Sequence, residues 1–153
     1  MKRAALLAFA LAACSGSAGL EGSLGADVSL AYTSIEIQRT PTAIAVIWLS
    51  GQDVVLKVTA SSSGLNLDAG GLTIDLAETV NGAQRGSVVR VVSGDTRSTL
   101  PAIEHGTLTF DQAPVAGKNA SGRIDILFQA GAAFGSGKTV FGSFSAAVTV
   151  PGQ

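Results

Sequence analysis

The chain has 153 residues, of which 46% are hydrophobic and 14% charged, and its formal net charge is −1. This length suits one domain with a proper core and is short for two, and the near-neutral charge offers no basic patch of the kind that binds nucleic acid. The single cysteine, Cys14, leaves no disulfide within the chain. Packing must therefore stabilise the fold.

The first fourteen residues have the pattern of an export signal. Lys2 and Arg3 give a positive start, and residues 4–11 form an apolar run that leads into Leu11-Ala12-Ala13-Cys14. The run is too short to cross a bilayer, which takes about 20 apolar residues in a helix. The last four residues, placed behind a basic and an apolar stretch, resemble a bacterial lipobox.

This resemblance implies a bacterial lipoprotein. In that family a lipid is attached to the cysteine sulfur, a signal peptidase cuts just before the cysteine, and the new N-terminus is acylated as well, with palmitate as the expected acid. Residues 1–13 are then the signal peptide and Cys14 is the lipidation site. The alternative is an ordinary secretory signal that is cut elsewhere, for instance after Ala18. Ser15 rather than Asp follows the cysteine, which resembles cargo of the outer membrane, on its periplasmic or its surface face.

A tether and one domain are expected after the cut. Residues 14–26 are rich in Gly, Ser and Ala, with two isolated leucines, a composition that behaves as a flexible linker. The remainder, residues 27–153, is predicted to form a single β-domain. Loss of Lys2 and Arg3 leaves eight basic residues against eleven acidic ones.

The domain shows a period of two rather than 3.6, which predicts β-strands throughout. Residues 43–49 are apolar at almost every position, as in a strand covered on both faces. In the next strand, Val54, Leu56, Val58 and Ala60 alternate with Val55, Lys57 and Thr59. Asn81-Gly82 marks a turn across which residues 88–92 are expected to pair with residues 72–76. The clearest alternation lies in residues 123–129 and 143–150, which predict a C-terminal hairpin. The side chains expected to face inward from it are Ile124, Ile126, Phe128, Phe144, Ala146, Val148 and Val150.

About eight short strands with Gly, Asn and Pro between them predict an all-β fold. We expect an antiparallel β-sandwich, with a small closed β-barrel as the alternative. Uneven loops and the doubly apolar strand favour two stacked sheets. One Trp and one Tyr are too few for the aromatic girdles of a transmembrane barrel.

Residues 132–139, which end in Gly137-Lys138-Thr139, match a loose form of the phosphate-binding P-loop. That site needs a helix to begin at the Lys-Thr end, so that its amides face the phosphates. The residues that follow, 140–144, are β-branched, aromatic and interrupted by Gly. The sequence therefore predicts a hairpin loop here and no nucleotide binding.

Other candidates for chemistry are isolated. His105 is the only histidine, and without a second His or a free thiol no zinc-type cluster can form. No Ser lies in a nucleophile elbow, and no calcium loop of the EF-hand type is present. Asn119-Ala120-Ser121 fits a glycosylation sequon but is predicted to serve as a turn. We expect no catalytic residue, metal or cofactor.

Two classes of function remain after these exclusions. The first is a non-catalytic envelope lipoprotein, a structural or binding module displayed at the membrane surface to hold an envelope protein or a glycan. The second is a carrier with a cavity in its β-core for a small apolar ligand. An enzyme is not expected, because the sequence contains no recognisable set of nucleophile, base and orienting residues. The discriminating feature is whether the core is filled or hollow.

Overall fold

The computed structural model describes residues 19–152 and confirms the all-β class. One short 3-10 helix, η1 (Ser23–Ala26), precedes ten strands. The strands are β1 (Ser34–Arg39), β2 (Ala43–Ser50), β3 (Asp53–Ser61), β4 (Thr73–Asp75), β5 (Thr79–Val80), β6 (Ala83–Gln84), β7 (Gly86–Val91), β8 (Ile103–Phe110), β9 (Asn119–Phe128) and β10 (Thr139–Thr149). Cys14 lies outside the described residues.

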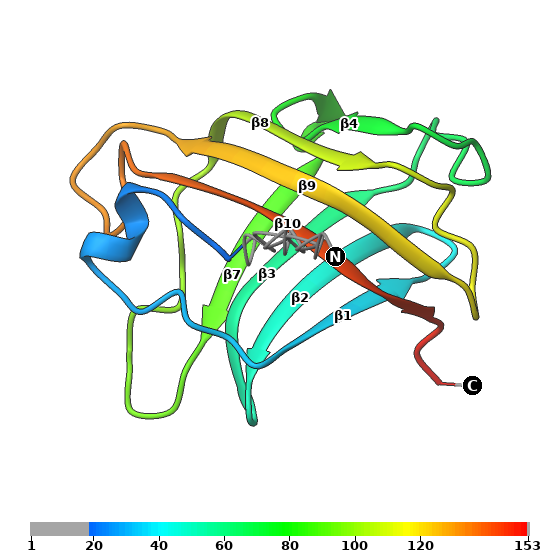
Figure 1. Cartoon of the computed structure of the whole chain (residues 1–153). Coiled ribbons are helices and arrows are strands. Elements are labelled where there is room, and N and C mark those ends of the chain that lie inside the picture. Colours follow the sequence, from blue (N-terminus) through cyan, green and yellow to red (C-terminus); the bar gives the residue numbers. More distant parts are fainter. Residues whose placement is uncertain (1–18, 153) are drawn as a thin grey trace, which may run out of the picture.

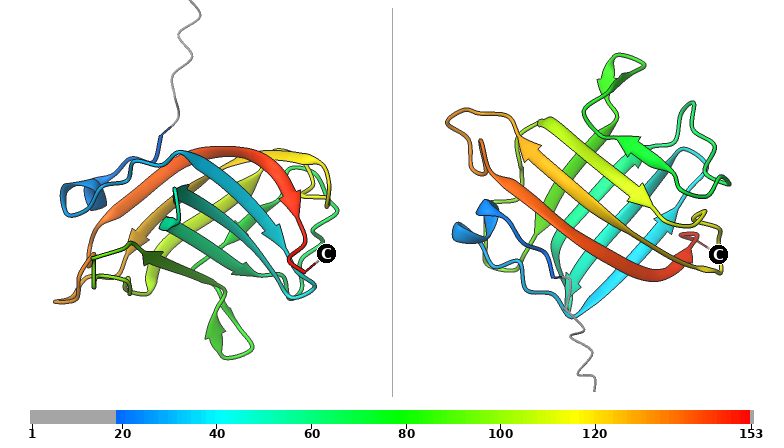
Figure 2. Two further views of the ribbon diagram at one scale, coloured as in Figure 1. Left: turned by 90° about the horizontal axis from the view of Figure 1, so that it is seen from below. Right: turned by 45° about the horizontal axis from the view of Figure 1, so that its top comes forward.

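Eight of the strands form one sheet in the order β4-β8-β9-β10-β1-β2-β3-β7, and β5 and β6 form a small separate hairpin. The sheet is rolled so that its two halves face each other across the core, in a barrel-like shape that is nearly closed (Figures 1 and 2). All neighbouring strands are antiparallel except β1 and β10, which run parallel. Of the two all-β arrangements considered, this one has the rolled form of the barrel with the facing layers of the sandwich.

The C-terminal hairpin predicted from the period of two is formed by β9 and β10. Its register pairs Ile124 with Gly142 and Ile126 with Val140, so every second side chain enters the core. Phe128, Phe144 and the other predicted inward positions are buried or half-buried, whereas Arg123 and Asp125 are exposed. A shift of one residue would exchange these two sets, which is why the sequence specifies the pairing strongly.

Aromatic rings fill the middle of the core. Phe144 packs edge-to-face against Trp48 at 6.2 Å and against Phe110 at 5.2 Å between ring centroids. Trp48, Phe110 and Phe128 expose no surface, and neither do aliphatic neighbours such as Ile44 on the facing half of the sheet. Because a space the size of a water molecule would expose whatever lines it, no such space touches these side chains. The interior around them is filled.

The two edge strands, β4 and β7, are joined by single hydrogen bonds rather than by a ladder. The backbone of Leu76 donates to Gly106 of β8 at 2.8 Å and accepts from Gly86 of β7 at 2.8 Å. Beside it, the Gln84 side-chain amide makes two hydrogen bonds, of 2.7 and 2.9 Å, with the backbone of Ile103. Val89 also forms an isolated bridge with Thr99. These contacts nearly close the sheet and shield edges that would otherwise pair with other chains.

Three details differ from the sequence expectation. Residues 19–26, which lie in the expected tether, belong to the folded domain, because Leu20 and Leu24 are buried in the core. Strand β7, expected to pair with residues 72–76, pairs with β3 instead, because Asn81-Gly82 closes only the β5–β6 hairpin. A register shift in β3 also brings Val55 into the core, as β-bulges do.

Candidate functional site

The proposed lipidation site precedes the described chain by a short distance. Cys14 lies outside the described residues, which begin five positions later at Gly19. Glu21 pairs with Phe141 of β10 through two backbone hydrogen bonds of 2.8 and 2.9 Å. The Thr139 backbone N–H donates to the Ser23 hydroxyl at 2.9 Å, and the Ser23 backbone N–H donates to the Thr139 hydroxyl at 3.2 Å. The N-terminal segment, residues 19–26, is thus fixed along the first half of β10.

The P-loop-like residues adopt the predicted hairpin loop. Strand β10 begins at Thr139, so no helix begins at the Lys-Thr end of the motif. The ammonium group of Lys138 lies 3.4 Å from the Asp27 carboxylate, at the end of the barrel that carries η1. The feature that a P-loop requires is therefore replaced here by a strand.

The other isolated candidates are exposed and apart. His105 lies on the outer face of β8, next to a register shift, and Asn119 begins β9 rather than a turn. Within residues 19–152 no group of three or more His, Cys, Asp or Glu side chains comes close enough to hold a metal ion.

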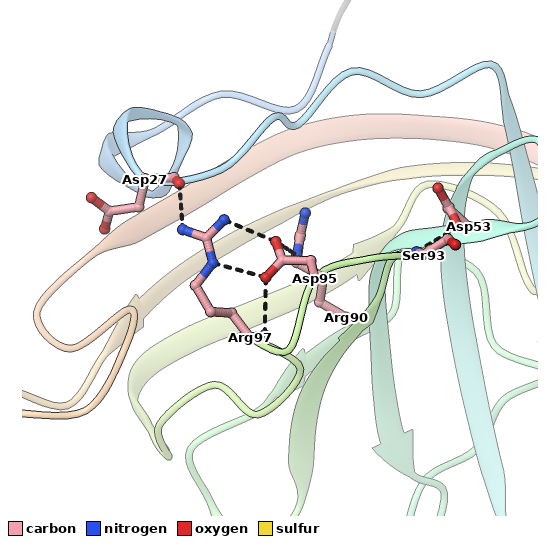
Figure 3. Close-up of polar contacts among 6 residues, drawn as sticks. All are labelled: Asp27, Asp53, Arg90, Ser93, Asp95 and Arg97. Atoms are coloured by element: carbon pink, nitrogen blue, oxygen red, sulfur yellow. Dashed lines mark hydrogen bonds and ion pairs between the residues drawn. The ribbon is translucent and has the colours of Figure 1, made fainter.

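A polar cluster closes the end of the barrel that carries η1 (Figure 3). Arg90, on β7, points inward, is almost fully buried and donates to Asp95 at 2.6 Å. Arg97 holds the same carboxylate with two side-chain hydrogen bonds of 2.9 Å and one backbone hydrogen bond of 3.0 Å. The outer guanidinium nitrogen of Arg97 also donates to the Asp27 carbonyl at 3.0 Å, and its guanidinium lies 5.4 Å from the centre of the Phe134 ring.

The electrostatics of this cluster are set by the two arginines. The hydrogen bonds from Arg97, assisted by the one from Arg90, hold the pKa of the Asp95 carboxyl well below its usual range. In return Asp95 raises the pKa of Arg97. Nearby, the Asp53 carboxylate accepts from the Ser93 backbone at 2.9 Å (Figure 3). Two arginines thus share the Asp95 carboxylate, and together they hold this end of the barrel closed.

The opposite end of the barrel carries the candidate binding groove. It has a volume of about 510 Å³ and lies between the β1–β2 turn, residues 62–68 and residues 115–116. Arg39 spans it, donating to Asp68 at 2.9 Å and to the Pro114 carbonyl at 3.0 Å. Leu65, Val115 and other apolar side chains line the remainder. A concave surface with apolar walls and a few fixed polar groups is the usual form of a binding site.

A second surface crosses the outer face of five neighbouring segments. Glu21, Phe141, Asp125, Thr107 and Asp75 are directly opposite one another in register, from the N-terminal segment across β10, β9 and β8 to β4. Side chains opposite each other in a sheet share a face, so these five form one row. Phe141 is 43% exposed.

The next row contains Ser143, Arg123, Thr109 and Thr73, and the two rows enclose a shallow hollow of about 580 Å³. Among the described residues, neither Arg123 nor Asp125 forms an ion pair. Sequence reasoning placed Arg123 and Asp125 on the outer face but missed Phe141, because it gave no inward or outward position to residues 139–142. The alternation within β10 itself, continued from Phe144, would have placed Phe141 outward.

Comparison with known proteins gives no relative: no family model matches the chain, and neither a curated protein nor a solved structure matches it. Among the residues described, no helix has the length and apolar character needed to cross a bilayer.

Proposed function

We propose that this chain is a lipid-anchored envelope lipoprotein, a non-catalytic structural or binding module held at the membrane surface by lipid on Cys14. The filled core is the observation that favours a surface-binding module over a carrier of an apolar ligand. Trp48, Phe110 and Phe128 expose no surface, so the centre of the barrel has no room for the small apolar ligand that a carrier would enclose. Binding is then left to the surface, where the groove beside Arg39 combines apolar walls with a fixed guanidinium.

The distribution of polar groups supports a non-catalytic role. Catalysis needs a nucleophile, a base and an orienting group in mutual contact. Here Lys138 is paired with Asp27 at one end of the barrel, His105 is exposed on β8, and Asp95 is saturated by arginine hydrogen bonds. The partner we propose is an envelope protein or a glycan, in the periplasm or at the cell surface, with the outer membrane as the location.

Fractionation of cells that express the wild type and a Cys14→Ser variant tests the anchor. We expect the wild type in the outer-membrane fraction, labelled by radioactive palmitate, and the variant unlabelled and released from the membrane. Equal membrane retention of both proteins, with no label in either, would refute the anchor.

A titration with an apolar fluorescent probe, 1-N-phenylnaphthylamine, tests the choice between module and carrier. Because the core is filled, we expect no saturable binding to the folded domain in detergent-free buffer. One tight site per chain, lost on unfolding in urea, would favour the carrier instead.

A further inference from the structure

The distance between Cys14 and the folded domain is short. Four residues, 15–18, separate Cys14 from Gly19. Five Cα-to-Cα steps span at most about 18 Å even when fully extended, whatever conformation they adopt. The headgroup layer on each side of a bilayer is roughly 5 to 8 Å thick. A lipid on Cys14 therefore holds the point where the chain enters the fold within about 18 Å of the cysteine, a distance of roughly two to four headgroup layers.

That point of entry is fixed on one side of the barrel. Leu20 is buried in the core, and Glu21 is paired with Phe141. The Gly19 carbonyl oxygen also lies so close to β10 that it would be 2.8 Å from a Cβ added at Gly142. The chain therefore enters the fold beside the first half of β10, on the side where β10 and β1 diverge (Figure 2).

We infer that the side of the barrel around Gly19 lies against the lipid headgroups and forms a membrane-facing surface of Phe141, Ser145, Ala147 and Ala31. The inference rests on the proposed lipidation of Cys14. All four side chains are exposed. A shallow hollow of about 680 Å³, lined by residues 19–22 and 29–32, lies within this surface and leaves room for headgroups.

The composition of this surface suits a neutral membrane. Residues 19–38 and 139–153 contain no Lys or Arg, so no basic cluster is present to attract anionic lipids, an attraction worth about 1 kcal/mol per basic residue. Glu21, opposite Phe141, gives this surface a negative charge that does not attract anionic lipids. Its Ser and Ala side chains carry no charge whose hydration would be lost on close approach, and Phe141 supplies apolar area at the interface. The anchor rather than electrostatic attraction thus sets the orientation.

The opposite side of the barrel then points away from the membrane. It is formed by β7 and the β5–β6 hairpin, which projects from the body (Figure 2). Val89 and Val91 on β7 are 41% and 61% exposed. The surface that remains accessible to large partners includes these valines.

Quenching of site-specific labels tests the orientation. Cys14 is the only cysteine, and the lipid occupies its thiol, so an introduced cysteine is the only reactive one. Ala31→Cys and Ala147→Cys place a fluorescent label on the membrane-facing surface. Ser87→Cys on β7 and Thr79→Cys on β5 are matched controls, since all four positions are exposed. The lipidated protein is reconstituted in phosphatidylcholine vesicles that contain a headgroup-spin-labelled lipid.

We expect at least threefold stronger quenching at positions 31 and 147 than at 79 and 87, with no increase when a quarter of the lipid is replaced by phosphatidylglycerol. Equal quenching at the four positions in protein that carries the lipid by mass spectrometry and floats with the vesicles would overturn the orientation alone. Stronger quenching at 79 and 87 would overturn it as well. Absence of lipid mass on Cys14 would instead refute the proposed function, and the orientation with it.

Discussion

Removing the ring of Phe128 should destabilise the domain by about 4 kcal/mol. Phe128 is fully buried on β9. Its transfer from water is worth about 2 to 3 kcal/mol, and a residual cavity of about 80 Å³ adds about 2 kcal/mol. The sum lies within the range of about 3 to 5 kcal/mol found for Phe→Ala in protein cores. This is a large share of the roughly 5 to 15 kcal/mol that stabilises a typical domain.

Urea unfolding measures this effect, and the protein provides its own reporter. Trp48 is the only tryptophan and is fully buried, so its fluorescence follows unfolding. With a denaturant slope of about 2 kcal/mol/M, the midpoint of Phe128→Ala should fall by about 2 M. Asp125 lies three residues earlier on the same strand but is exposed and without an ion pair. Asp125→Ala should therefore change the free energy of unfolding by no more than about 0.5 kcal/mol. Equally mild shifts for both variants would show that the inward face of β9 is wrongly assigned.

Three further substitutions test local features of the fold. Gly122→Ala should cost about 1 to 3 kcal/mol in urea melts, because a Cβ there collides with the Thr109 carbonyl oxygen, whereas Gly131→Ala, whose nearest contact would be 3.5 Å away, should be neutral; similar losses in both would contradict the close approach. Because the folded pKa of Asp95 is depressed from 3.8, its stabilising contribution is present above that value and is lost as the pH falls through the folded pKa. The difference in urea midpoint between wild type and Asp95→Asn should therefore shrink from pH 7 to pH 3, and a constant difference would refute the ion-pair assignment. Lys138→Ala should change stability by at most about 0.5 kcal/mol, as expected for a partly exposed ion pair, and calorimetry should detect no ATP binding in the parent protein; saturable binding that the substitution abolishes would revive the P-loop reading.

The sequence predicted which side chains of a strand enter the core more reliably than which strands are neighbours. Ile124, Ile126 and Phe128 alternate with polar residues, and burial follows that alternation. The alternation does not indicate which strand lies beside it, because any strand with an apolar face can pair with any other. For this reason the pairing of β7 with β3, and the parallel pairing of β1 with β10, could be seen only in the structure.

The same distinction applies to the candidate sites: a motif within one segment could be judged from the sequence, whereas a site that joins distant segments could not. Rejection of the P-loop needed only the residues after Thr139, and β10 does begin there. The groove beside Arg39 and the cluster around Asp95 could not be predicted, since each joins segments that are far apart in the chain: Arg39 reaches Asp68 and the Pro114 carbonyl, and Arg97 reaches the Asp27 carbonyl. Such contacts follow from the rolled topology rather than from local spacing.

The docked N-terminal segment shows how composition can mislead. Averaged over residues 15–26, Gly, Ser and Ala indicate a linker, yet each buried leucine contributes roughly 1.5 to 3 kcal/mol, and Leu20 and Leu24 are both buried. Gly22 has a φ of 124° and its Cα lies against the Thr139 carbonyl, where a Cβ has no room. This glycine is thus a requirement of docking rather than a sign of flexibility.

Docking changes what a lipid on Cys14 would do. A linker of twelve residues would let the domain turn freely at roughly 17 to 21 Å root-mean-square from its anchor, and no side of the barrel would be favoured. With the segment fixed on β10 through Glu21 and Ser23, only residues 15–18 separate the anchor from a rigid body. Under the proposed lipidation, the hydrogen bonds of Glu21 therefore set the orientation of the domain. Weakening the docked segment, for instance by Leu24→Ser, should reduce the difference in label quenching between the two sides of the barrel while leaving the protein on the vesicles.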